Sequence, residues 1–181
     1  MNKPLIALVA VILLAGLAYL YLVPAGEPVT SLKTYISGSG NLTFNYPGYY
    51  VLEEREVAGG ERGEQHLTLI KESELKREAS EGPTSINIDI YQNDLDQLTT
   101  EQWIKNDTRS NFKLSPDGKL SSTTLASRQA LTYLWDGLYR GQTIALTTTK
   151  NVYTFSVTTL TATDKIKSDF EALLKTVDIK E

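Results

Sequence analysis

Hydrophobic and polar residues alternate along much of the chain after residue 41. In the segment "SINIDIY", Ile86, Ile88 and Ile90 would share one face, and the residues between them are polar or acidic. Because successive strand residues point to opposite sides, this period of two predicts a half-buried β-strand. A strand is predicted in the same way over "NVYTFSVTT". Further strands, rich in Thr, Val, Ile or aromatic residues, are predicted at Leu42–Tyr46, Tyr49–Val57, His66–Lys71, Leu120–Ala126, Gln129–Trp135 and Leu138–Thr148.

A helical spacing replaces this alternation near the C-terminus. The apolar residues of the last segment lie three or four positions apart, which places them on one stripe of an amphipathic helix: Ile166, Phe170, Leu173, Leu174 and Val177. A second, shorter helix is predicted after Thr99 or Thr100. There Thr99 and Gln102 have the spacing of a capping box, and Trp103 and Ile104 supply apolar contacts. The charged stretch 72–82 is expected to be a solvated loop or a short helical turn.

Turn sequences connect the predicted strands. Asp136-Gly137 is a pair favoured in two-residue type I′ hairpins, because both central residues need a positive φ. Thr149 to Asn151 is expected to form another turn. Consecutive hairpins produce an antiparallel meander. The predicted fold class is therefore α+β, an antiparallel sheet meander flanked by helices.

The N-terminal segment has no polar face at all. Leu5–Val23 is 19 residues long and uncharged, which is enough to span the roughly 30 Å hydrocarbon core of a bilayer. Lys3 precedes it and Glu27 follows it, so positive charge stays inside and the rest of the chain is exported. The alternative is a signal peptide cleaved near Ala25. We therefore predict an anchor or signal at 1–23, a linker at 24–40 and one folded domain at 41–181.

Composition narrows the classes of function. The formal net charge is −4, which argues against a nucleic-acid partner because such partners select clustered Lys and Arg. Cysteine is absent from the sequence, which excludes disulfides, thiolate metal sites and a lipid-modified cysteine. Neither a dinucleotide-binding G-x-G-x-x-G nor a phosphate-binding loop occurs.

Several residue types capable of chemistry occur in the sequence. His66 is the single histidine, so any histidine-based catalysis must use it, but its place at a strand start favours a surface role. Two S-x-x-K matches, at Ser73 and Ser110, lack the companion motifs of serine–lysine hydrolases. The carboxylates Glu53, Glu54 and Glu56, like Asp89, Asp94 and Asp96, lack the spacing of a calcium loop. No catalytic, metal or cofactor site is predicted.

Four stretches of the sequence carry a resemblance to a known family. They are "FNYPGYYV" at the first predicted strand, "TTEQWI" at the start of a helix, "LASRQALTYLW" before the hairpin, and "KNVYTFSVT" with the "LLKTVDI" ending. Together they resemble the PsbP-like family. The resemblance implies an antiparallel sheet flanked by helices in an α-β-α sandwich. The chain departs from the family pattern at Ser127 and Arg128, where relatives tend to carry a glycine.

The expected function is that of a binding or assembly module anchored on the extracytoplasmic side of a membrane, without catalytic activity. The alternative is an extracytoplasmic enzyme whose catalytic carboxylates are brought together only by the fold. The expected contacts are the membrane, through the N-terminal helix, and an unidentified protein partner. A two-residue hairpin would set Trp135 opposite Leu138 and Tyr133 opposite Arg140, on one face of the sheet. These four residues are the candidate partner-binding patch, unless that face belongs to the core.

Overall fold

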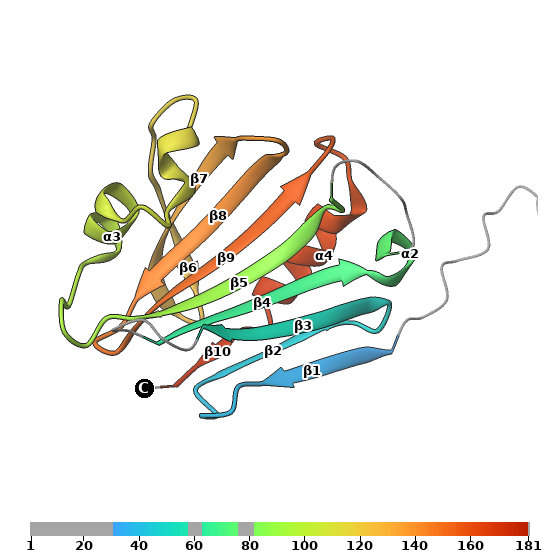
Figure 1. The fold of residues 1–181 in the computed structure, drawn as a ribbon, viewed down its shortest axis with the longest axis horizontal. Coiled ribbons are helices and arrows are strands. Elements are labelled where there is room, and N and C mark those ends of the chain that lie inside the picture. The colour runs from blue at the N-terminus through green and yellow to red at the C-terminus, as the bar shows by residue number, and fades with distance from the viewer. Residues whose placement is uncertain (1–30, 58–62, 76–81, 181) are drawn as a thin grey trace, which may run out of the picture. The chain divides into compact units, whose positions relative to one another are not determined.

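A computed structural model describes residues 31–57, 63–75 and 82–180 of the chain (Figure 1). The chain divides into two compact units, Met1–Ser31 and Leu32–Glu181, and the description below concerns the second. The predicted membrane anchor and its alternative cleavage site lie outside the described residues. Within the described ranges, no helix has the length and hydrophobicity needed to cross a membrane.

A seven-stranded antiparallel sheet forms the centre of this unit, with strand order β3-β4-β5-β9-β8-β7-β6. Every neighbouring pair is consecutive in sequence except β5 and β9, so two meanders meet at that pair. The predicted strands are confirmed with small shifts at their ends; β4 begins two residues before its predicted start, and β8 begins two residues after its predicted start. The strands are β3 (Tyr50–Val57), β4 (Glu64–Lys71), β5 (Ser85–Gln92), β6 (Ser121–Leu125), β7 (Arg128–Asp136), β8 (Arg140–Thr147) and β9 (Asn151–Thr159).

A second, smaller sheet contains β1 (Leu32–Ile36), β2 (Leu42–Pro47) and β10 (Asp178–Ile179), in the order β1-β2-β10. The predicted linker 24–40 is therefore wrong over 32–36, because β1 pairs with β2 along its whole length. Only Tyr35 of β1 is buried, and its ring stacks on Phe44 at 5.0 Å. A strand that buries one side chain leaves almost no hydrophobic alternation to detect.

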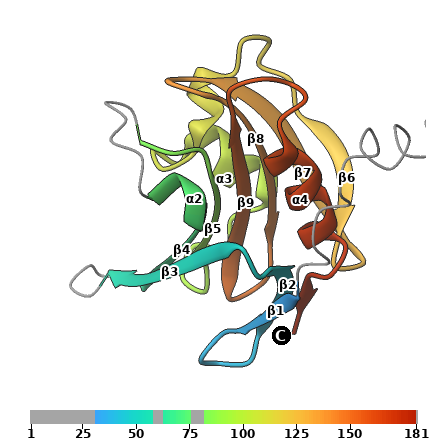
Figure 2. The same ribbon diagram turned by 90° about the vertical axis from the view of Figure 1, so that its right-hand side faces the viewer.

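Helices cover the two sides of the large sheet, and Figure 2 shows α4 (Lys165–Leu174) on one side and α3 (Thr100–Asn106) on the other. The capping box of α3 forms as predicted: Gln102 N donates to Thr99 Oγ1, and Thr99 N donates to Gln102 Oε1. A 3-10 helix, η1 (Asn111–Leu114), follows α3, and α2 (Glu72–Leu75) is the short helical turn expected after β4. We call the two sides of the sheet the α3 face and the α4 face.

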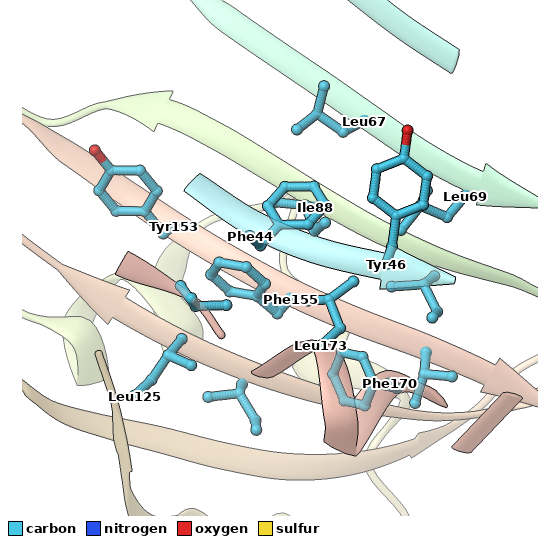
Figure 3. Close-up of a cluster of buried hydrophobic side chains, with 14 of the residues drawn as sticks. Phe44, Tyr46, Leu67, Leu69, Ile88, Leu125, Tyr153, Phe155, Phe170 and Leu173 are labelled. Atoms are coloured by element: carbon cyan, nitrogen blue, oxygen red, sulfur yellow. The ribbon is translucent and has the colours of Figure 1, made fainter. Parts of the chain in front are cut away.

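Each face of the sheet has its own hydrophobic cluster. On β8, Ile144 packs in the cluster of the α4 face, whereas its neighbour Ala145 packs in the cluster of the α3 face. The larger cluster fills the space between the sheet, α4 and the small sheet (Figure 3). The predicted stripe of α4 is buried there through Ile166, Phe170 and Leu173. The architecture is thus a sheet-dominated α+β fold, with helices on both sides of the sheet.

The turn between β6 and β7 contains backbone strain. Leu125 pairs with Arg128, so Ala126 and Ser127 form a two-residue loop. Both have a positive φ, 50° and 60°, as a type I′ turn requires. A side chain in this left-handed region costs roughly 1–2 kcal/mol per residue, and glycine avoids that cost. This is also where the family resemblance leads one to expect a glycine.

We predict that Ser127→Gly raises the free energy of unfolding by about 0.5–1 kcal/mol, because relief of the left-handed strain exceeds the added entropy of the unfolded chain. Denaturant melts monitored by circular dichroism measure the change. Thr149→Gly is the matched control, since Thr149 lies in the β8–β9 turn and does not have a positive φ. If Ser127→Gly destabilises the protein as much as the control does, the turn is not strained.

Candidate functional site

The hairpin between β7 and β8 determines where the predicted patch residues lie. Asp136 pairs with Arg140, Trp135 with Gly141 and Tyr133 with Thr143, so the connection has three residues and the predicted two-residue register is wrong. Among the described residues, the glycines with positive φ are Gly40 and Gly118. Gly137 therefore does not adopt the type I′ conformation on which the prediction depended.

This register separates the four residues of the predicted patch. Tyr133 and Trp135 lie on the α3 face, with the second hydrophobic cluster. Arg140 stands opposite Asp136, an odd number of residues from Tyr133, and therefore points to the α4 face. Leu138 is in the loop and is 70% exposed. The predicted single face is wrong.

Tyr133 belongs to the core. Its side chain is 3% exposed, its ring meets Phe112 edge-on at a centroid distance of 5.3 Å, and its hydroxyl lies 3.2 Å from Ser110 Oγ. Ser110 Oγ also accepts a hydrogen bond from Phe112 N, which caps η1. The second S-x-x-K match is thus structural. The first extends to Lys76, which lies outside the described residues.

A pocket of about 450 Å³ opens at the β7–β8 loop end of the α4 face. Leu134, Gln142 and Val157 contribute from the strands, while Ala162 and Lys167 contribute from the start of α4 and the loop before it. Arg140, which is the first residue of β8, lies at the edge of the pocket. We call this the Arg140 pocket. The three-residue hairpin creates it, because a two-residue hairpin would have placed Arg140 on the other face.

The charges in the Arg140 pocket are unbalanced. Arg140 and Lys167 line it together with one carboxylate, that of Asp136. Within the part of the chain that the structure describes, the side chains of Arg140 and Lys167 form neither an ion pair nor a hydrogen bond. Two cations thus line one pocket without an anionic partner at salt-bridge distance.

Trp135 and Gly141 also line this pocket. The indole ring of Trp135 lies over Gly141 so closely that a Cβ added at position 141 would be 2.1 Å from two ring atoms. The indole Nε1 donates to Thr143 Oγ1 at 2.9 Å, and that hydroxyl lies 2.9 Å from Ser156 Oγ. Position 141 therefore requires glycine for space, and the ring is held in one orientation.

A second polar constellation, which we call the His66 cluster, contains Glu64, His66, Asp89, Asp107 and Arg109. His66 Nδ1 lies 2.8 Å from Asp89 Oδ1, and its Nε2 lies 3.6 Å from Glu64 Oε2. Arg109 pairs with Asp107 through Nε at 2.8 Å and Nη2 at 2.6 Å, and its Nη1 pairs with Glu64. Each charge of this cluster has a partner within it.

Tyr91 lies beneath this cluster. Its ring centroid is 4.4 Å from Cζ of Arg109, and the ring stacks on Trp103 at 5.3 Å. Burial raises the pKa of the Tyr91 phenol, so it stays neutral. The hydrogen bonds with Asp107 raise the pKa of Arg109, so the guanidinium stays charged. These contacts fasten the segment after α3 to the sheet.

Two other carboxylates of interest accept hydrogen bonds from nearby side chains. Glu54 accepts from Tyr35 Oη at 3.1 Å, and Asp94 accepts from Gln92 Nε2 at 2.9 Å. Among the described residues, no group of three or more His, Asp or Glu side chains is placed to hold a metal ion. Sequence reasoning missed Asp169, a buried carboxylate in α4 that accepts from Tyr49 Oη at 2.7 Å and Tyr50 Oη at 3.0 Å.

Sequence reasoning also missed Arg109 and Lys167. Arg109 stands in a polar loop, and its partner Glu64 is far away in sequence. The sequence places Lys167 on the polar side of an amphipathic helix, where lysine is usually solvated. Only the tertiary packing of α4 beside β8 and β9 brings Lys167 into the same pocket as Arg140.

Comparison with solved structures identifies the class of fold. The chain is similar to the solution structure of cyanobacterial PsbP (CyanoP) from Synechocystis sp. PCC 6803, with a TM-score of 0.55 and 12% identity over 87% of this chain and 97% of that one. A crystal structure from Bacteroides thetaiotaomicron is similar with a TM-score of 0.48 and 13% identity, over 82% of this chain and 48% of that one. Neither a family model nor a curated protein sequence matches the chain.

The chain therefore has a PsbP-like fold, as the sequence motifs led us to expect. At 12% identity the likeness concerns the fold and assigns no role to any side chain.

We predict that Gly141→Ala displaces the ring of Trp135, lowers the free energy of unfolding by about 1–3 kcal/mol and changes the tryptophan emission spectrum. Gly137→Ala is the matched control in the same hairpin. A Cβ there would lie 3.6 Å from its nearest neighbours, so its effect should stay within about 0.5 kcal/mol. Equal stability of the two variants would contradict the close packing of Trp135 over Gly141.

Proposed function

We propose that this protein is a membrane-tethered, extracytoplasmic binding module that captures a partner through the end of the sheet around the Arg140 pocket. The N-terminal segment 1–23 would act as the tether, with Leu5–Val23 crossing the bilayer and the folded unit outside. Cleavage near Ala25 would instead release the same unit in soluble form.

The main support for a binding role is a group of exposed leucines at this pocket. Leu134 lines the pocket and is 58% exposed, Leu138 lies in the adjoining hairpin and is 70% exposed, and Leu160 lies between two lining residues and is 66% exposed. The exposure of large apolar side chains to water is unfavourable. A group of them on one surface therefore indicates an interaction site.

The proposed binding surface differs from the one expected from the sequence. Leu138 and Arg140 remain in it, because they lie in or beside the pocket. Tyr133 is a core residue and does not belong to it, and the ring of Trp135 lies on the opposite face, where it packs over Gly141. Arg is enriched among the residues that dominate binding energy, and an apolar rim would exclude water around it.

The positions and partners of the carboxylates favour binding over catalysis. A carboxylate enzyme needs two acids that converge on a pocket, whereas among the described residues Asp136 is the one carboxylate that lines the Arg140 pocket. The three carboxylates of the His66 cluster each bond to Arg109 or His66. These three carboxylates do not belong to the lining of the Arg140 pocket.

The proposed location predicts that protease added to intact cells or spheroplasts removes the folded unit and leaves a short membrane-bound fragment. Immunoblotting of an N-terminal tag and a C-terminal tag follows the two products. A mature protein that starts near Gly26 and fractionates with soluble exported proteins would contradict the retained anchor, while leaving the binding role open.

The proposed surface predicts a site-specific crosslink. A photoreactive amino acid at Leu138, in the full chain in its native membrane, should yield a discrete adduct on gels, identifiable by mass spectrometry. The same group at Lys150 is the matched control, because this exposed residue follows the far end of β8. Arg140→Ala should remove the Leu138 adduct. Equal adducts from both positions, or an adduct unaffected by Arg140→Ala, would refute the surface.

A further inference from the structure

We infer that the Arg140 pocket binds a small amphipathic anion, a single carboxylate group attached to an aliphatic chain. This inference deepens the proposed binding function and rests on it, because it states the chemistry of the ligand that the same surface would take. It follows from three properties of the pocket: its size, its unpaired cations and its apolar border.

The size of the pocket suits an organic molecule. Its volume of about 450 Å³ lies within the roughly 300–1,000 Å³ that small-molecule sites occupy. The floor comes from three strands of a rigid sheet, and one wall comes from the start of α4. Asp164 holds that wall in place, because its carboxylate accepts from Leu160 N at 2.7 Å and Thr161 N at 2.9 Å. The pocket is therefore preformed.

The charges in the pocket select an anion. Arg140 and Lys167 approach from different elements, β8 and α4, and neither side chain is paired within the described residues. With Asp136 included, the lining has one more cation than anions, although the chain as a whole carries a net charge of −4. A guanidinium can bind a carboxylate through two parallel hydrogen bonds, and an ammonium adds a point charge beside it.

The apolar border selects an aliphatic chain attached to that anion. Val157 and Leu134 lie inside the pocket, and Leu138 and Leu160 adjoin it. Covering this surface is favourable by about 25 cal/mol for each Å² removed from water. A small inorganic anion would leave the leucines exposed, and a neutral lipid chain would leave both cations unpaired. An amphipathic carboxylate satisfies both halves of the site.

Octanoate is the probe that tests this inference. The full chain is placed in phosphatidylcholine nanodiscs and titrated calorimetrically, with empty discs as the reference, and tryptophan fluorescence provides a second signal. We expect saturable binding of octanoate. Octanamide, which lacks the charge, and acetate, which lacks the chain, should each bind at least about tenfold more weakly, the ratio expected when one charge-assisted hydrogen bond or comparable contact is lost.

Variants connect this binding to the pocket. Arg140→Gln and Lys167→Gln should each weaken octanoate binding about tenfold or more, whereas Lys150→Gln, at the other end of β8, should leave it unchanged. Thermal melts of the three variants should match the parent, since the side chains of Arg140, Lys167 and Lys150 form neither a hydrogen bond nor an ion pair among the described residues.

Three results would overturn the inference: no saturable binding, equal affinity for octanoate and octanamide, or an unchanged affinity in Arg140→Gln. If octanoate binds in phosphatidylcholine discs but not in phosphatidylglycerol discs, a lipid headgroup fills the pocket. That result would overturn the inference that the ligand is a free carboxylate. A crosslinked partner at Leu138 without octanoate binding would leave the proposed function standing and remove only this inference.

Discussion

The pairing of β5 with β9 is the interaction on which the rest of the structure depends. It is the one junction of the large sheet between strands that are not consecutive in sequence. Across it Ile88 faces Phe155, and both side chains are fully buried. Because this pair joins the β3-β4-β5 meander to the β6-β7-β8-β9 meander, it lets one hydrophobic cluster extend under both halves, with α4 packed upon it (Figure 3). Pairing β5 with β9 closes the long stretch of chain between them, which costs conformational entropy. The burial of apolar side chains along the whole strand offsets that cost.

The candidate binding site depends on a smaller constraint, the number of residues in the β7–β8 connection. Side chains alternate between the faces of a sheet, so one residue more or less in a hairpin moves every following side chain to the other face. The three-residue loop places Arg140 on the α4 face, beside Lys167, and leaves Tyr133 and Trp135 on the α3 face. The pocket is therefore a consequence of hairpin geometry combined with the position of the helix.

Two arginines of the described chain illustrate how the same side chain serves structure or recognition. Arg109 is surrounded by Asp107, Glu64 and the ring of Tyr91, and these contacts hold the segment after α3 on the sheet. A charge neutralised in this way has little affinity left for a ligand. Arg140 has no such partner in the described structure and stands at the edge of a pocket bordered by leucines. Its electrostatic free energy is available for binding, which is why the binding proposal concerns this end of the molecule.

Local patterns in the sequence determined most of the secondary structure. The alternation of Ile86, Ile88 and Ile90, the stripe of α4 and the capping box at Thr99 are properties of neighbouring residues, so the sequence alone was sufficient for them. Strand β1 was missed because Tyr35 is its single buried side chain, which leaves no alternation of buried and exposed hydrophobic residues along it. The site was decided only by tertiary structure. The hairpin register is local, but the Asp136-Gly137 pair predicts a two-residue turn that does not form. The pairing of Arg109 with Glu64 and the meeting of Arg140 with Lys167 depend on distances between segments remote in sequence, and no local preference encodes those distances.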